Sequence, residues 1–332
     1  MRAAYYEKTG DAAEVLQIGD IAQPEPGPGE VLVRIRASGI NPSDTKKRMG
    51  RMPAPAEYPR IVPHSDGAGV IEAVGPGVSA DRIGQRVWLW NAQWHRAFGT
   101  AAAYCALPSE QAVARPEHTG FAEAACLGIP AETAWTAVME GHPGPGRCVL
   151  VHGGAGAVGA LAIQVAHHAG ARVISTVSTP EKAQVARDAG ADETMDYRQG
   201  NVAEAVLDLT DGKGADHIVD VDFGANHAIN AACIAANGSI AAYSAPSAPV
   251  FEMDYYAFAM RAARLRFVQV YILEPAERAA AIEGITGLLQ QRVLTPTIAR
   301  AYPLERIADA HEAQESGTLA GNIVLDLSGE GG

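Results

Sequence analysis

The sequence predicts an α/β protein with two domains, one rich in β-strands and one built on a doubly wound parallel sheet. The first third of the chain holds short strand-like runs between Pro and Gly clusters, and the middle alternates strand-like and helix-like segments. A glycine-rich turn joins the first of these later strands to a helix. The length of 332 residues exceeds what one hydrophobic core usually organises, so two domains are expected.

Short runs rich in β-branched and aromatic residues predict the strands of the first third at 31–35, 69–74 and 86–90. Pro and Gly clusters separate them, and the cluster at 24–29 is typical of a surface turn. A closing strand is expected at 320–325.

Strands and helices alternate from about residue 125 onward, which indicates a parallel sheet. The expected strands are 148–152, 172–177, 193–197, 215–221, 238–243 and 267–272. One expected helix follows the glycine turn directly, and others are expected at 180–189, 202–209 and 276–291.

The glycine turn has the spacing of a dinucleotide-binding site. Gly154 permits a tight turn, Gly156 lets the backbone approach the phosphates, and Gly159 lets the helix pack closely on the strand. The free N–H groups of the following helix would face a pyrophosphate. A chain with 35 glycines produces such spacings by chance, so an ordinary glycine-rich turn is the alternative.

Composition narrows the class of protein. The formal net charge of −12 disfavours general binding to nucleic acid, and no apolar run approaches the ~20 residues of a membrane span. The charged N-terminus does not resemble a signal peptide. The four cysteines form no C-x-x-C pair, so a reducing cytoplasm is the expected location.

The end of the second strand of the parallel sheet indicates which cofactor binds. An NAD site usually places Asp or Glu there, whereas this chain reads Ser175-Thr176-Val177-Ser178-Thr179. Ser178 and Lys182 suit a 2′-phosphate, so we expect NADP(H) rather than NAD(H). Glu181 opposes this interpretation, and the alternative for Lys182 is a solvated helix lysine.

With these features in place, the chain resembles the zeta-crystallin-like quinone oxidoreductases of the medium-chain dehydrogenase/reductase superfamily. The likeness is carried by the stretches 39–45, 65–75, 128–135 and 149–159. It implies a GroES-like catalytic domain made of 1–125 and 266–332, and a Rossmann NADP(H)-binding domain at 126–265. It also implies a homodimer or homotetramer formed through edge strands near 267–272.

The same resemblance assigns the residues of the site. Asn41, Lys46 and Thr133 would line the nicotinamide end, although Lys46 departs from the aromatic residue often found there. Ala155, Gly156, Ala157 and Val158 would contact the pyrophosphate. Ser178, Lys182 and Tyr197 would contact the adenosine phosphate. The contacts that close over the cofactor would come from Tyr243, Ser244, Val270, Tyr271 and Asn322.

Zinc-dependent relatives hold their metal with a Cys, a His-Glu pair and a further Cys or Asp. The matching positions here are Asn41, Ser65-Asp66 and Ile129, so no metal is expected. Without that Lewis acid, alcohol oxidation is disfavoured, whereas a quinone or conjugated enone delocalises the charge that arrives with a hydride.

The expected activity is therefore NADPH-dependent reduction of quinones or enones. Asn41 would donate to a substrate oxygen or hold the nicotinamide ribose, and Lys46 would supply charge near the developing enolate. Two alternatives stay open: an alcohol or polyol dehydrogenase, and a non-catalytic NADPH-binding role of the crystallin or RNA-binding kind.

Overall fold

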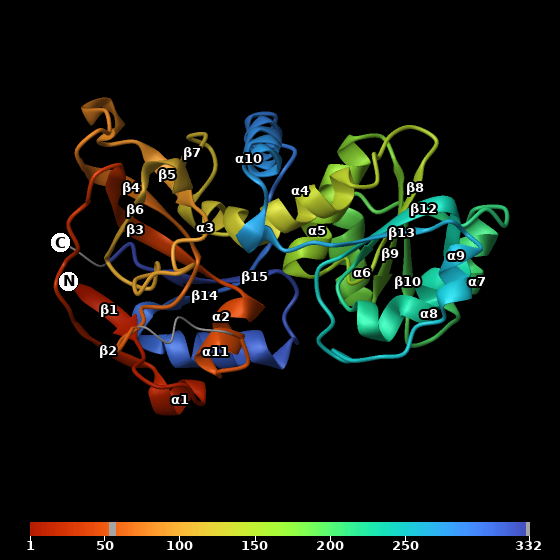
Figure 1. Ribbon diagram of the computed structural model, residues 1–332, viewed down its shortest axis with the longest axis horizontal. Helices are drawn as coiled ribbons and strands as arrows, with labels where there is room; N and C mark the ends of the chain where they lie inside the picture. The colour runs from red at the N-terminus through yellow and green to blue at the C-terminus, as the bar shows by residue number, and fades with distance from the viewer. Residues whose placement is uncertain (53–57, 330–332) are drawn as a thin grey trace. The chain divides into compact units, whose positions relative to one another are not determined.

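The computed structural model describes residues 1–52 and 58–329 (Figure 1). The chain divides into two compact units. Unit 1 comprises Met1–Pro130 and Pro296–Gly332, and unit 2 comprises Ala131–Thr295. No helix in the described ranges is both long and apolar enough to cross a bilayer.

Unit 1 is built on a mainly antiparallel sheet around the long strand β3 (Glu30–Ile40). The order along the sheet is β14-β15-β3-β4-β5-β7, and β6 also pairs with β3. The other strands of this sheet are β4 (Asp66–Val74), β5 (Arg86–Leu89), β6 (Tyr104–Pro108), β7 (Ala112–Ala114), β14 (Ile298–Pro303) and β15 (Asn322–Asp326). Strands β14 and β15 pair in parallel, whereas β15 runs antiparallel to β3.

The remaining elements of unit 1 cover this sheet and its ends. Strands β1 (Arg2–Tyr5) and β2 (Gln17–Asp20) form a separate antiparallel ribbon. The helices are α1 (Ala12–Val15), α2 (Pro42–Arg48), α3 (Phe121–Ala124) and α11 (Ile307–Ser316). A buried apolar core joins residues of both chain segments, among them Val33, Ile71, Leu304 and Leu325.

Unit 2 is a doubly wound sheet with the order β10-β9-β8-β11-β12-β13, and each neighbouring pair is parallel. The strands are β8 (Cys148–Val151), β9 (Arg172–Val177), β10 (Glu193–Asp196), β11 (Ala215–Asp220), β12 (Ile234–Ala242) and β13 (Arg264–Phe267). The helices are α4 (Glu132–Met139), α5 (Ala157–His168), α6 (Pro180–Asp188), α7 (Val202–Leu209), α8 (Phe223–Cys233), α9 (Tyr255–Ala259) and α10 (Pro275–Gln290).

The predicted fold class, a GroES-like domain with a Rossmann domain, is confirmed. The unit boundaries lie near residues 130 and 295, whereas the sequence analysis expected 125 and 265. The stretch 266–295 groups with unit 2 because β13 pairs with β12 and α10 packs on α4. Trp135 and Gly284 show how close this packing is, since a Cβ on Gly284 would lie 2.1 Å from Trp135 Cζ2.

One predicted strand is wrong. The stretch expected as a strand at 267–272 contains only the last residue of β13, and Val270–Ile272 forms a short 3₁₀ turn. Apolar alternation predicts extended backbone, but the Val270 carbonyl accepts a hydrogen bond from the buried Arg278 guanidinium instead of a neighbouring strand.

A chain of buried hydrogen bonds links α11 to β3 and β4 within unit 1. His311 Nε2 lies 2.9 Å from His64 Nε2, His64 Nδ1 lies 2.8 Å from Ser38 Oγ, and Ser38 Oγ lies 2.7 Å from Thr100 Oγ1. Thr100 donates its only hydroxyl hydrogen to the Asp66 carbonyl. Ser38 must therefore donate to Thr100, His64 Nδ1–H to Ser38, and His311 Nε2–H to the bare Nε2 of His64.

The two histidines of this hydrogen-bonded series, His64 and His311, are neutral in the folded protein. Burial lowers the pKa of His64 to about 3 and also lowers the pKa of His311. His64 adopts a left-handed φ of 78°, so the hydrogen bonds hold it in a conformation that side chains rarely take.

We expect the free energy of unfolding to decrease as the pH falls from 6.5 toward 3. Below pH 6.5 the unfolded protein binds a proton at His64, whereas the folded protein does not. This difference lowers the free energy of unfolding by about 2 kcal/mol at pH 5 from this residue alone. Urea unfolding at pH 7 and pH 5 measures the loss. His64→Asn, which tolerates a left-handed φ, should show the smaller loss, and equal losses in the two proteins would contradict the prediction.

Candidate cofactor and active site

The glycine turn after β8 leaves no room for side chains on the face toward the sheet. A Cβ on Gly154 would lie 2.0 Å from Ser175 Oγ, and one on Gly159 would lie 2.3 Å from the Gly153 carbonyl oxygen. Gly153 takes a left-handed φ of 71° and Gly156 is the exposed N-cap of α5. The open side of the turn thus presents bare backbone and the first N–H groups of α5, which fits a pyrophosphate.

A buried polar network supports the turn from below. The Gly153 N–H donates to Thr176 Oγ1 at 3.1 Å, and His152 Nδ1 lies 3.3 Å from the same oxygen. His152 Nε2 lies 2.9 Å from Asn230 Oδ1, and Asn230 Nδ2 donates to Asp220 at 2.6 Å. The sequence analysis missed this network. Its signal was polar residues at the carboxyl ends of otherwise apolar strands.

The residues expected at the adenosine phosphate follow two neighbouring strands. Ser178 directly follows β9, Lys182 lies in the first turn of α6, and Tyr197 directly follows β10 with 52% of its surface exposed. Thr179 caps α6 by accepting from the Lys182 N–H at 3.2 Å. Glu181 is fully exposed, and hydrogen bonds at the helix start lower its pKa.

Four of the five residues expected to close over the cofactor lie at the same carboxyl edge of the sheet. Tyr243 and Ser244 directly follow β12, while Val270 and Tyr271 lie in the turn after β13. A main-chain hydrogen bond from Tyr243 N to the Asp220 carbonyl ties Tyr243 to the network, and the Ser244 carbonyl accepts from Phe223 N. Burial and the nearby Asp220 raise the pKa of Tyr243, so its hydroxyl stays protonated.

Unit 1 gathers a second set of site residues around Asp66. Asn41 Nδ2 donates to Asp66 Oδ2 at 2.8 Å, and the Ile129 N–H donates to both carboxylate oxygens at 2.9 and 3.0 Å. The Asn41 N–H donates to Asp44 Oδ2 at 2.9 Å, which starts α2. A tetrahedral zinc needs thiolate, imidazole or carboxylate lone pairs directed at one point, and these residues do not fit it. Among the described residues, no three His, Cys, Asp or Glu side chains form a metal-binding group.

Two neighbouring lysines of α2 have different surroundings. Lys46, the lysine expected in the site, is half-buried, whereas Lys47 is only 2% exposed. Lys47 Nζ donates to Gln93 Oε1 at 3.0 Å and to Ser65 Oγ at 3.5 Å. Burial lowers the pKa of Lys47, and Asp44 and Asp66 oppose that shift. The sequence analysis missed Lys47 because adjacent lysines on a short helix do not reveal which one faces inward.

Two further residues were expected in the site, one in each unit. Thr133 is buried in the first turn of α4 in unit 2. Asn322 begins β15 in unit 1, where its side-chain and main-chain N–H groups donate to the Thr297 carbonyl at 3.0 and 2.8 Å.

Two family models match the chain: the alcohol dehydrogenase GroES-like domain over residues 27–136, and a zinc-binding dehydrogenase model over residues 157–283. A quinone oxidoreductase of Pseudomonas aeruginosa is 33% identical over 94% of this chain and 95% of its own length. A mycobacterial structure complexed with NADPH has a TM-score of 0.87 at 32% identity, covering 98% of this chain and 100% of that one.

A structure of an NAD-dependent alcohol dehydrogenase also resembles the chain, with a TM-score of 0.89 at 30% identity, covering 98% of this chain and 99% of that one. The two domains together define the class, which is the medium-chain dehydrogenase/reductase superfamily. Within that class the chain belongs to the quinone oxidoreductase family, as its identity to the Pseudomonas aeruginosa enzyme shows.

Proposed function

We propose that the protein transfers a hydride from NADPH to quinones or conjugated enones without a zinc ion. The observation that carries the proposal is the set of hydrogen bonds around Asp66, whose two carboxylate oxygens are held by Asn41 and Ile129. The quinone oxidoreductase and the NADPH-complexed structure among its relatives support the choice of acceptor and cofactor.

The chain's own residues bind and orient the reactants. The glycine turn and the first N–H groups of α5 hold the pyrophosphate. Ser178, Lys182 and Tyr197 hold the adenosine phosphate, while Tyr243, Ser244, Val270 and Tyr271 face the other half. NADPH, when bound, supplies the hydride.

Asn41 and Lys46 act on the acceptor in this proposal. The bond to Asp66 fixes the orientation of the Asn41 amide, which holds the substrate oxygen or the nicotinamide ribose. Lys46 supplies positive charge near the oxygen that becomes anionic after hydride transfer, and a proton from solvent water completes the reduction. Orientation contributes most of the rate, because a quinone or enone delocalises the incoming charge itself.

A panel of quinones and a panel of enones test this activity, with NADPH oxidation followed by absorbance and metal content measured in the same sample. We expect turnover with at least one panel and no stoichiometric zinc. NADPH binding without turnover would point to a non-catalytic role. Zinc-dependent oxidation of alcohols would support the second candidate, an alcohol or polyol dehydrogenase, which the NAD-dependent structural relative favours.

The choice of NADPH over NADH is tested at the end of β9. Lys182→Ala and Ser178→Ala should each raise the KM for NADPH by about tenfold and leave that for NADH unchanged, since about 1.4 kcal/mol corresponds to a factor of ten. Glu181→Gln is the matched control, because it removes the neighbouring negative charge and should not weaken NADPH binding. A tenfold preference of the unaltered protein for NADH would contradict the assignment.

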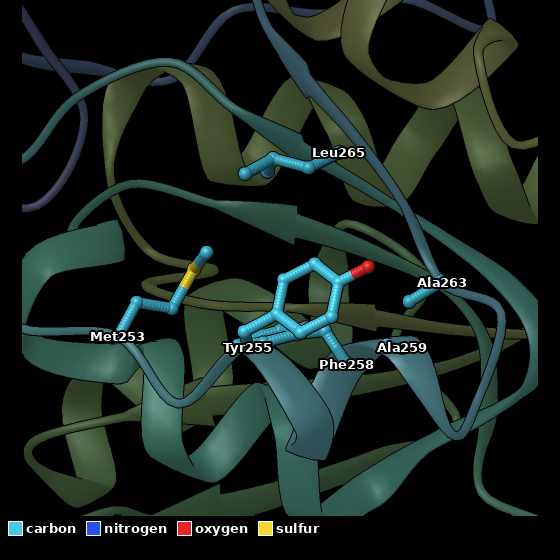
Figure 2. A pocket seen from close by; sticks show the side chains of 6 residues that line it. All are labelled: Met253, Tyr255, Phe258, Ala259, Ala263 and Leu265. Atoms are coloured by element: carbon cyan, nitrogen blue, oxygen red, sulfur yellow. The ribbon is translucent and has the colours of Figure 1, made fainter.

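We further propose a homodimer or homotetramer that forms through the β13 edge of the unit 2 sheet. Exposed apolar side chains lie on this edge and in the segments beside it: Phe267 (70% exposed) ends β13, Ile272 (68%) lies in the turn after it, and Met260 (81%) follows α9. Beside them lies a pocket of about 240 Å³, and Figure 2 shows Met253 and Tyr255 on one side of it and Leu265 of β13 on the other. Unpaired edge strands with apolar neighbours favour association.

Met260→Glu and Ile272→Glu should each shift the protein toward monomer, because each puts a charge into the expected contact. Light scattering after gel filtration measures the mass. Ile83→Glu, on an exposed apolar residue of unit 1, is the control and should leave the mass unchanged. An unaltered protein that is monomeric at micromolar concentration would refute this proposal.

A further inference from the structure

A buried ion pair in unit 2 lies outside the residues discussed so far as binding or catalytic. Glu132 is 1% exposed and Arg278 is 8% exposed. Arg278 Nη1 donates to Glu132 Oε2, and Arg278 Nη2 donates to the Val270 carbonyl. Burial raises the pKa of the Glu132 carboxyl, and the Arg278 guanidinium opposes that shift by favouring the charged form.

This single guanidinium connects three elements. Glu132 is the first residue of α4 and precedes Thr133 directly. Arg278 lies in the first turn of α10, and Val270 begins the turn that follows β13. The Arg278 guanidinium therefore ties the residue before Thr133 to the backbone just before Tyr271.

The sheet order indicates which half of a dinucleotide these elements meet. The glycine turn follows the central strand β8, and strands β9 and β10 on one side carry the residues expected at the adenosine phosphate. Strands β11, β12 and β13 lie on the other side of β8. A dinucleotide bound at the carboxyl edge spans this switch in strand order, so its nicotinamide half faces the turn after β13.

The pair is costly to bury, which is a reason to assign it a role. Desolvation of two charges often exceeds their attraction, and apolar replacements of such pairs are often neutral or stabilising. Its benefit here is geometric, because apolar side chains of the same size would not fix the Val270 carbonyl.

We propose that Glu132 and Arg278 are positioning residues that set Thr133 and Val270–Tyr271 in the arrangement that receives the nicotinamide half of the cofactor. This inference rests on the proposed function, since it requires a bound dinucleotide. Neither side chain has to touch the cofactor, because both act through the backbone that they hold.

The test compares two ligands that differ only in the half at issue. NADP⁺ contains both halves, whereas 2′,5′-ADP contains the adenosine phosphate half and lacks the nicotinamide. Glu132→Gln keeps the size of the side chain and removes its charge. We expect it to weaken NADP⁺ binding by about tenfold or more and to leave the affinity for 2′,5′-ADP within about twofold, as measured by calorimetry.

The matched control is Glu277→Gln on α10, the helix that carries Arg278. Glu277 makes an exposed ion pair with Arg266, so the same chemical change there should alter neither affinity. A folded Glu132→Gln protein that binds both ligands as the unaltered protein does, or loses both equally, would overturn the inference.

A double variant guards against loss of folding. Glu132→Leu with Arg278→Met removes both charges and leaves no unpaired one, so the fold should persist as judged by circular dichroism. This variant should still bind 2′,5′-ADP and should bind NADP⁺ at least about tenfold more weakly. Full affinity of the double variant for NADP⁺ would overturn this inference and leave the proposed function standing. An unaltered protein that binds neither ligand would overturn both the inference and the proposed function.

Discussion

The close contact between backbone and backbone at the glycine turn is the constraint on which the arrangement of unit 2 depends. The Gly153 carbonyl oxygen would lie 2.3 Å from a Cβ on Gly159, and Ser175 Oγ would lie 2.0 Å from a Cβ on Gly154. Strand β8, strand β9 and helix α5 can approach to this degree only because these positions have no side chain. The position of α5, and with it the direction of its free N–H groups, follows from that contact.

The parallel sheet then determines which residues meet. Because all its strands end at one edge, the segments after β8, β9, β10, β12 and β13 converge there although they are distant in the sequence. The polar network of His152, Asn230 and Asp220 lies at that edge and connects the ends of β8 and β11 through hydrogen bonds to α8. In unit 1 the candidate site residues are brought together by side-chain hydrogen bonds rather than by strand ends, because Asn41 and Ile129 both donate to the Asp66 carboxylate.

Local patterns predicted the regular elements well. The strand at 172–177 and the helix at 202–209 match β9 and α7 at both ends, because Gly, Pro and Asn signals bound them in the sequence. Pairings between distant side chains could not be read in this way. The sequence predicts a strand at 267–272, whereas Val270 lies in a turn where its carbonyl accepts from Arg278, which also contacts Glu132. Likewise, only the packing of α2 shows that Lys47 faces inward rather than Lys46.

The sheet of unit 1 draws its strands from both ends of the chain, with β15 placed between β14 and β3. During synthesis the polypeptide for unit 2 is complete at residue 295, while β3 still lacks its neighbour β15. Because domains generally fold as units while the chain emerges, unit 2 can fold before the sheet of unit 1 is complete. Strand β3, which Asn41 directly follows, gains its neighbour β15 only after residues 322–326 have been synthesised.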